Sequence, residues 1–218
     1  MSKIVHDYVE DYIRGLITEN NELLNELRLY AEENNVPIVH KEVAQFLKVI
    51  IKANNIKRIL EVGTAIGYSA LLMADAAGSD CEIVTIERDE NMYNTALENI
   101  KRAKAEEKIK IIKGDALEIL DKLDGKYDMI FIDGAKGHYS EMLNKINRLL
   151  KLNGIVFADN VLFRGMVCSN ELLIRRKITI VKRMRKYLKE ISDSSIFETV
   201  VLPVGDGVAL STKIKEEL

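Results

Sequence analysis

Apolar residues recur along this chain with two different spacings. From about Val5 to Asn34, and again from Lys41 to Asn54, they lie mostly three or four positions apart, which predicts helices, the first with a break near residues 18–20. Further on, short runs rich in β-branched residues alternate with helical segments. The predicted strands are Arg58–Val62, Glu82–Glu87, Ile109–Lys113, Tyr127–Asp133 and Gly154–Asp159, and the predicted helices between them are Ser69–Ala77, Asn91–Ala105, Leu117–Leu123 and Tyr139–Leu150.

This alternation predicts an α/β fold with a doubly wound, parallel sheet. A long basic helix, about Glu171–Glu190, then precedes Phe197–Leu202 and Val208–Lys213, which flank a PVGDG turn and are expected to form an antiparallel C-terminal hairpin at one sheet edge. We therefore expect one domain over residues 1–218. Residues 1–54 would form a helical cap or a dimer arm, and residues 55–218 would form the sheet core.

A glycine-bearing turn follows the first predicted strand, in the stretch LEVGTAIGYS at residues 60–69. Gly63 lets the turn close, and Gly67 lets the backbone approach a ligand, although glycine is also common in plain strand-to-helix turns. Glu61 is expected to end the strand and place its carboxylate in the loop. The dehydrogenase pattern GxGxxG lacks its middle glycine here, and a nearby carboxylate disfavours a pyrophosphate. A cationic nucleoside, S-adenosylmethionine, fits better.

Acidic residues also stand at the end of the second predicted strand and just after the third. Glu87 lies 24 residues after Gly63, where a carboxylate can accept both hydroxyls of an adenosine ribose. Asp115 lies where an adenine amino group could be read. Either acid could instead cap a helix or be a solvated loop charge.

Three oxygen-bearing side chains stand at the ends of the fourth and fifth predicted strands. Asp133, Asp159 and Asn160 would meet at the carboxyl edge of the sheet and could hold Mg²⁺ or Mn²⁺. The alternative is that each caps a following helix. Lys136 is close enough in sequence to share the site, as a base or as a group that orients the substrate oxygen. It could equally be a surface lysine.

Composition and charge narrow the class of protein. The chain has 218 residues, a net charge of −2 and two distant cysteines, Cys81 and Cys168, without CxxC spacing. These features predict a cytoplasmic protein with reduced cysteines and no zinc site. No apolar run is long enough to cross a membrane, and the first residues lack the apolar core of a signal peptide.

A local excess of positive charge contrasts with this nearly neutral total. After Arg164, the stretch up to Glu190 has Glu171 as its only acid, and its basic residues include Arg175, Arg176 and Lys177. Such a run is usually a solvated helix face. Beside a catalytic edge it would also suit a polyanionic substrate such as RNA.

In these motifs the sequence resembles the cation-dependent O-methyltransferases of the caffeoyl-CoA and catechol type. The resemblance covers roughly residues 37–213 and is carried by LEVGTAIGYS (60–69), FIDGAK (131–136), DNVL (159–162) and GDG (205–207). Within that family, VPI (36–38), DNVLFRG (159–165) and RRK (175–177) resemble the bacterial tRNA 5-hydroxyuridine methyltransferases. The loops that hold a phenolic CoA ester in the plant enzymes are not evident.

The resemblance implies a class I S-adenosylmethionine-dependent methyltransferase with a Rossmann-like sheet, usually dimeric. It carries the metal ligands onto Asp133, Asp159 and Asn160 and the catalytic lysine onto Lys136. It carries the cofactor contacts onto Val39, Glu61, Gly63, Tyr68, Ser69, Glu87, Asp115, Ala116 and Asp133.

We therefore expect a Mg²⁺-dependent enzyme that methylates 5-hydroxyuridine at the tRNA wobble position to 5-methoxyuridine. A single-stranded anticodon loop would let the base enter the pocket, and Arg164, Arg175, Arg176 and Lys177 would contact phosphates. One alternative is a small-molecule O-methyltransferase of the catechol or caffeoyl-CoA type. Another is a protein that binds a nucleoside without chemistry. A nicotinamide dehydrogenase is possible on fold alone, but the missing glycine and the metal residues count against it.

Overall fold

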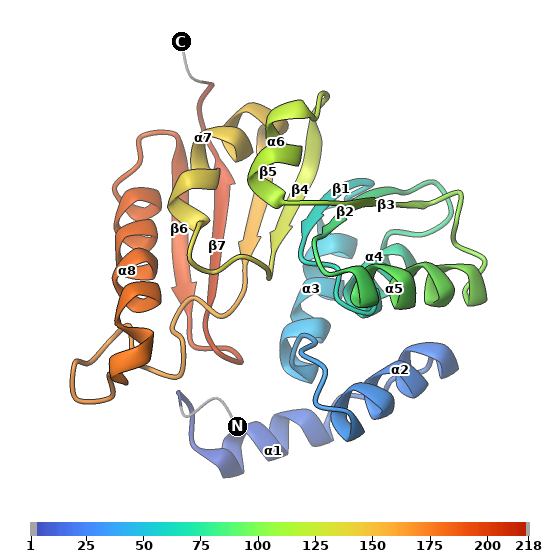
Figure 1. Cartoon of the computed structure of the whole chain (residues 1–218), viewed down its shortest axis with the longest axis horizontal. Coiled ribbons are helices and arrows are strands. Elements are labelled where there is room, and N and C mark those ends of the chain that lie inside the picture. Colours follow the sequence, from blue (N-terminus) through green and yellow to red (C-terminus); the bar gives the residue numbers. More distant parts are fainter. Residues whose placement is uncertain (1–3, 217–218) are drawn as a thin grey trace.

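The computed structural model describes residues 4–216, so the first three and last two residues of the predicted domain lie outside it. Its seven-stranded sheet has the order β3-β2-β1-β4-β5-β7-β6, and β7 runs antiparallel to the other six strands (Figure 1). The strands are β1 (Arg58–Val62), β2 (Glu82–Glu87), β3 (Ile109–Lys113), β4 (Tyr127–Ile132), β5 (Leu150–Ala158), β6 (Phe197–Leu202) and β7 (Val208–Lys213). The predicted α/β fold, with its C-terminal hairpin, is confirmed.

The helices lie on both faces of this sheet. They are α1 (Asp7–Gly15), α2 (Glu22–Glu33), α3 (Lys41–Ala53), α4 (Tyr68–Ala77), α5 (Glu90–Arg102), α6 (Ala116–Lys122), α7 (Tyr139–Leu149) and α8 (Ile178–Ser192), with a 3₁₀ turn, η1 (Arg175–Lys177), before α8. The first helical segment of the sequence is broken into α1 and α2, as predicted. No helix within residues 4–216 has the length and apolar character needed to span a bilayer.

Two hydrophobic cores sandwich the sheet because successive strand residues point to opposite faces. Ile59 and Phe131 contribute to the core beneath α3, α4 and α5, whereas their neighbours Leu60 and Ile130 contribute to the core beneath α6, α7 and α8. All four side chains are fully buried. Burial on both faces explains why β4 is a continuous apolar run, as is typical of a central parallel strand.

Three predictions about these elements are wrong. Strand β5 does not begin at Gly154: it begins at Leu150, directly after α7. The basic helix does not begin near Glu171: turns and η1 occupy that stretch, and α8 begins at Ile178. Glu61 does not end β1 and does not lie in the loop. It pairs with Thr85 and Phe131 of the adjacent strands, inside the sheet, and its side chain is fully buried.

Helices α1 and α2 form an arm beside the carboxyl edge of the sheet (Figure 1). Arg14 of α1 forms an ion pair with Glu42 of α3 at 2.7 Å, which anchors the arm. Tyr8, Tyr12 and Leu16 project from the arm and are about 70% exposed, at 71%, 69% and 67%. The dimer role of this arm stays a prediction.

Candidate active site

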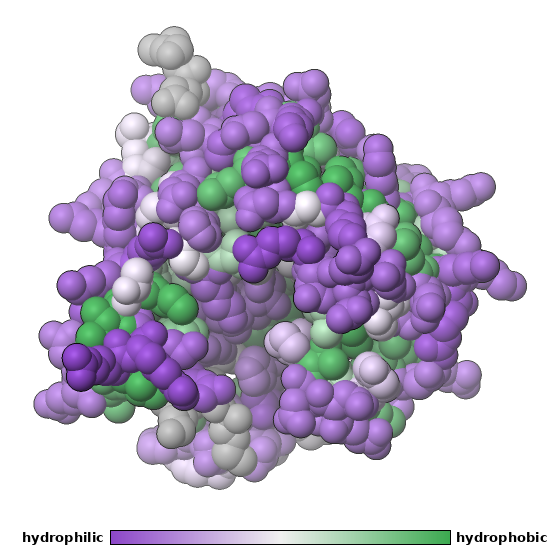
Figure 2. Space-filling model, in the orientation of Figure 1, coloured by the Kyte–Doolittle hydropathy of each residue, from purple (hydrophilic) through white to green (hydrophobic). Residues whose placement is uncertain are grey.

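The loops at the carboxyl ends of β1, β2, β4 and β5 enclose two adjoining cavities of about 420 and 590 Å³. Both cavities are lined by Gly63, Glu87, Gly134, Ala135 and Lys136, so they form one cleft with two halves. Figure 2 shows this face of the molecule hollowed near its centre and bordered mainly by hydrophilic residues. The cleft lies where open α/β sheets bind their ligands.

The floor of the cleft is a contact between two glycines. Gly63 follows β1 with φ +100°, and a Cβ on it would lie 2.8 Å from the backbone nitrogen of Gly134, which follows β4 by two residues. A Cβ on Gly134 would in turn lie 2.9 Å from the Cα of Gly63. The two loops can approach this closely only because neither residue has a side chain.

Glu87 lies between the two halves of the cleft. One carboxylate oxygen accepts a hydrogen bond from the backbone N–H of Ala65 at 2.9 Å, and the other accepts from the N–H groups of Arg88 and Asp89 at 2.8 Å. These three donors fix the carboxylate at the end of β2, as the proposed ribose contact requires. That role stays a prediction.

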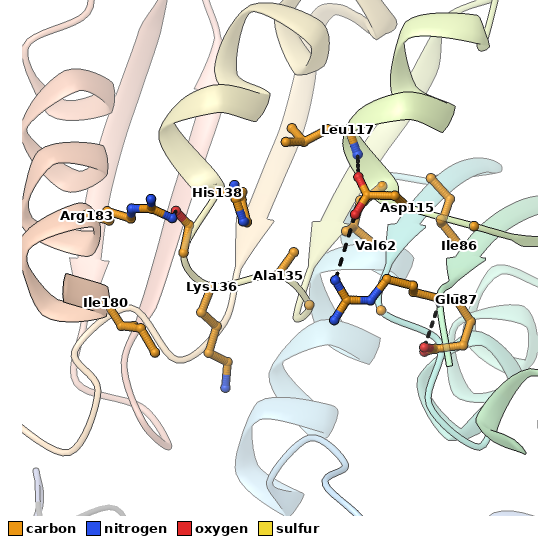
Figure 3. A pocket seen from close by; sticks show the side chains of 16 residues that line it. Val62, Ile86, Glu87, Asp115, Leu117, Ala135, Lys136, His138, Ile180 and Arg183 are labelled. Carbon is orange, nitrogen blue, oxygen red and sulfur yellow. Dashed lines mark hydrogen bonds and ion pairs between the residues drawn. The ribbon is translucent and has the colours of Figure 1, made fainter. Parts of the chain in front are cut away.

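Asp115 and Ala116 line the smaller cavity together (Figure 3). One carboxylate oxygen of Asp115 accepts from the backbone N–H of Leu117 at 2.9 Å and so caps α6, which is the alternative that the sequence left open. The other oxygen lies 3.9 Å from the guanidinium of Arg88. Figure 3 shows Glu87 and Asp115 on one side of this cavity and Lys136 on the other.

Glu61 lies beneath the cleft and has two hydroxyl partners. The hydroxyl groups of Ser69 and Thr85 each donate to its carboxylate at 2.5 Å. Burial raises the pKa of Glu61 to about 7, and the two hydrogen bonds only partly oppose that shift. The carboxyl group therefore keeps its proton to a higher pH than an ordinary glutamate.

We expect Glu61→Gln to abolish one source of pH-dependent stability. Between pH 4.5, the ordinary Glu value, and pH 7, the folded wild type holds more protons than the unfolded chain, so its free energy of unfolding falls as the pH rises, by about 3 kcal/mol in total. The neutral amide carries no such penalty at pH 8, and its oxygen can accept from one hydroxyl group while its NH2 group donates to the other. Urea unfolding at pH 5 and pH 8, without cofactor, measures this difference.

The control for that experiment is Glu33→Gln, because Glu33 is exposed on α2. This variant should keep the wild-type pH dependence. An equal loss of stability between pH 5 and pH 8 in Glu61→Gln and the wild type would contradict the prediction.

The other side chains predicted to contact the cofactor are buried against neighbouring protein groups. Arg28 of α2 donates to the hydroxyl oxygen of Tyr68 at 2.6 Å and to the backbone carbonyl of Val39 at 3.3 Å, and its guanidinium lies 4.7 Å from the Tyr68 ring centre. Val39, Tyr68 and Ser69 are buried, and none of them lines either cavity in the described structure. Their contacts with a cofactor stay predictions.

Asp133, Asp159 and Asn160 converge as predicted at the ends of β4 and β5. Asp159 is fully buried: one carboxylate oxygen accepts from the N–H of Asn160 at 2.7 Å, and the other has no hydrogen-bond partner among residues 4–216. Burial raises the pKa of Asp133 to about 6, and burial followed by the charge of Asp133 raises the pKa of Asp159. Neither aspartate caps a helix, because α7 begins after His138 and turns follow Asn160. That alternative is wrong.

Lys136 and Asp206 complete this end of the cleft. The Lys136 ammonium group donates to the side-chain oxygen of Asn160. Asp206, from the turn between β6 and β7, lines the larger cavity, and its carboxylate accepts from the backbone N–H of Arg164. Burial raises the pKa of Asp206. Its GDG motif contributes to the family resemblance, but Asp206 was not among the predicted site residues.

Comparison with known proteins identifies the family. Residues 16–214 match the sequence profile of the family described as O-methyltransferase. The chain belongs to the O-methyltransferase family. Its fold and family are those of the class I S-adenosylmethionine-dependent O-methyltransferases.

Relatives of this O-methyltransferase include plant and bacterial proteins. It is 32% identical over 206 residues to caffeoyl-CoA O-methyltransferase 2 of Populus trichocarpa, covering 89% of this chain and 83% of that protein. A crystal structure from Staphylococcus aureus, described as a candidate caffeoyl-CoA O-methyltransferase, has 37% identity and a TM-score of 0.89 over 95% of this chain and 100% of that one. The S-adenosylhomocysteine-bound methyltransferase PaMTH1 of Podospora anserina has 26% identity and a TM-score of 0.86 over 95% of this chain and 94% of that one.

The basic residues of this O-methyltransferase divide into two groups. Arg164, Arg175 and Arg176 are exposed, and Arg164 lines the larger cavity. Lys177 lies 5.7 Å from the ring centre of Phe163. Arg185, in contrast, donates to the backbone carbonyls of Met166 and Val167 and so holds the loop after β5.

Proposed function

We propose that this O-methyltransferase uses S-adenosylmethionine and a divalent cation, Mg²⁺ or Mn²⁺, to methylate the 5-hydroxyl of 5-hydroxyuridine at the wobble position of tRNA. The product would be 5-methoxyuridine. The main support for a cation is the fully buried Asp159 carboxylate. One of its oxygens has no hydrogen-bond partner in residues 4–216, and a second carboxylate, that of Asp133, lies nearby. Leaving such a charge uncompensated is costly.

The donor set fits a hard cation. Asp133, Asp159 and Asn160 offer two carboxylates and one amide oxygen, which Mg²⁺ prefers over nitrogen or sulfur. Within residues 4–216 no three His, Cys, Asp or Glu side chains form a metal-binding group, so the set depends on the amide and on oxygens from water or substrate. When bound, the cation would lower the pKa of the acceptor hydroxyl and stabilise its oxyanion.

Side chains around the cleft would position the acceptor oxygen and the methyl group and would take up the proton of the acceptor hydroxyl. The acceptor oxygen attacks the methyl carbon, the carbon–sulfur bond breaks, and S-adenosylhomocysteine leaves. Lys136, against Asn160, would act as the base that takes the hydroxyl proton or as the group that orients the acceptor oxygen. Glu87, fixed by three backbone N–H groups, would orient the ribose and with it the methyl group.

The larger cavity and its rim support an RNA acceptor. A 5-hydroxyuracil presents its hydroxyl next to a ring carbonyl, the pair of oxygens that a cation can bind together. The cavity of about 590 Å³ is large enough for a base, and exposed Arg164 lies at its edge. Arg175 and Arg176 are exposed in η1 and could contact backbone phosphates.

The experiment measures methyl transfer from labelled S-adenosylmethionine to bulk tRNA from a strain that lacks this gene, with Mg²⁺ and then with EDTA. We expect label in wobble 5-methoxyuridine that disappears with EDTA. Label in catechol or caffeoyl-CoA, with none in tRNA, would replace the RNA acceptor with a small phenol and leave the cation site standing. Equal labelling in EDTA would contradict the cation.

The variant Arg175→Ala/Arg176→Ala tests the RNA contact. Loss of two phosphate contacts should raise the KM for tRNA by roughly tenfold and reduce the slope of binding against salt by about 2. The matched control is Lys52→Ala/Lys101→Ala, whose exposed lysines lie near the ends of α3 and α5, at the opposite edge of the sheet. Equal effects in both variants would contradict a specific role for the arginines.

A further inference from the structure

His40 is a polar side chain in the cleft that neither the motifs nor the proposed chemistry uses. It lies immediately before α3 and lines the larger cavity with Asn160 and Asp206. A Cβ on Gly205 would lie 3.6 Å from both the Cβ and the Cδ2 of His40, so the imidazole packs over the turn that carries Asp206. The ring therefore belongs to the end of the cleft with the metal residues, away from Asp115 in the other cavity.

Arg14 of the N-terminal arm determines which ring nitrogen of His40 carries the proton. Its Nε and Nη2 atoms each donate a hydrogen bond of 2.7 Å to the carboxylate of Glu42. Nη2 also lies 3.2 Å from the Nδ1 of His40. A guanidinium can only donate, so Nδ1 must be the acceptor. An imidazole that accepts at Nδ1 is neutral and carries its proton on Nε2.

The Nε2–H group has no hydrogen-bond partner within residues 4–216, although the half-buried ring lines the cavity. This donor is therefore available to water or to a ligand oxygen in the cavity. Its neighbour in the ring, Cδ2, faces the Gly205 turn, and His40 and Asp206 line the same cavity.

We propose that His40 is a positioning residue that donates a hydrogen bond from Nε2 to an oxygen of the acceptor outside the pair bound by the cation. In 5-hydroxyuracil that oxygen is the second ring carbonyl, at C2, whereas a simple catechol has no third oxygen. His40 thereby selects acceptors with such an oxygen, and Arg14 selects the tautomer that can donate to it. The choice of uracil rests on the proposed function.

Three variants separate donation from packing. His40→Phe keeps a ring without a donor, His40→Ala removes the ring, and His40→Gln keeps an N–H group near the position of Nε2. With an anticodon stem-loop that contains 5-hydroxyuridine, we expect the acceptor KM to rise roughly fivefold in the Phe and Ala variants and to recover in Gln. The KM for S-adenosylmethionine should not change. Thermal unfolding confirms that each variant folds.

A modified acceptor tests the same bond from the other side. Replacing the C2 carbonyl oxygen by sulfur, a weak acceptor, should raise the KM of the wild type and have no further effect in His40→Phe. Additive effects of the two changes would overturn the proposal. So would a rise in the KM for S-adenosylmethionine, which would assign His40 to the cofactor.

Failure of the proposed function is distinguishable from failure of this inference. If the wild type methylates caffeoyl-CoA and not RNA, the RNA acceptor is wrong, and the same variants are measured on caffeoyl-CoA, which has a carbonyl oxygen beyond its hydroxyl pair. An unchanged acceptor KM would then overturn the role of His40, and a raised KM that the Gln variant restores would support it.

Nitrogen NMR of the labelled chain checks the tautomer of His40 directly: a proton on Nδ1 would overturn the proposal.

Discussion

Asp159→Asn is expected to lower kcat/KM for methyl transfer by about 10³-fold. The substitution removes the buried anionic oxygen that is best placed to hold a cation, and loss of a Lewis acid costs several kcal/mol of transition-state stabilisation. The shape of the site is kept, because the amide oxygen can still accept from the N–H of Asn160. Binding of S-adenosylmethionine, measured by calorimetry, should change little.

Thermal unfolding gives that variant a second readout. Mg²⁺ or Mn²⁺ should raise the Tm of the wild type, because a ligand that binds only the folded state stabilises it, and should not raise the Tm of Asp159→Asn. In EDTA the variant should melt at or above the wild-type temperature, since a buried charge without a full set of partners has been removed. The control is Asp124→Asn, whose side chain is 99% exposed. Wild-type activity in Asp159→Asn would contradict the cation site.

Gly63→Ala is expected to destabilise the protein by about 3 kcal/mol and to weaken cofactor binding. The new Cβ would meet the nitrogen and Cα of Gly134 at 2.8 and 2.9 Å, and φ +100° is itself strained for alanine. Because the contacted atoms are backbone, relief requires the loop after β4, with Asp133, to move. Urea unfolding and calorimetric titration with S-adenosylmethionine measure the two effects.

Gly15→Ala is the matched control for that substitution. Gly15 ends α1, its φ is not positive, and nothing lies within 4 Å of the position of its Cβ. Alanine there should stabilise the chain slightly, by up to about 1 kcal/mol. If Gly63→Ala unfolded at the wild-type urea concentration, the close contact between the two loops would not constrain the cleft.

The sheet was predictable because its strands are buried on both faces. The run Met129–Ile132 can satisfy that requirement only as a central strand, and Glu82–Glu87 differs from it mainly in its charged ends. The convergence of Asp133 and Asp159 then follows from topology, since the carboxyl ends of parallel strands meet at one edge. The start of α8 was not predictable in the same way, because its first residue, Ile178, follows Lys177, which provides no side-chain cap.

The parts of the site that the sequence did not reveal depend on contacts between distant residues. Arg14 and His40 are 26 positions apart, and Arg28 and Tyr68 are 40 positions apart. Such pairs cannot be predicted from the spacing of residues along the sequence. Glu61 was misplaced because a glutamate near a strand end usually faces water, whereas here hydroxyl groups from α4 and β2 surround it.

The insertion of β7 between β5 and β6 sets an order for folding during synthesis. Strands β1 to β4, with Gly63 and Glu87, can pair with one another once β4 has left the ribosome, because the pairs β1–β2, β2–β3 and β1–β4 need no later residue. The outer edge of β5 has no partner until residues 208–213 emerge. The end of the cleft around Asp206 therefore forms last, and because Ile180 and Arg183 of α8 line the smaller cavity, neither half of the cleft is complete until late in synthesis.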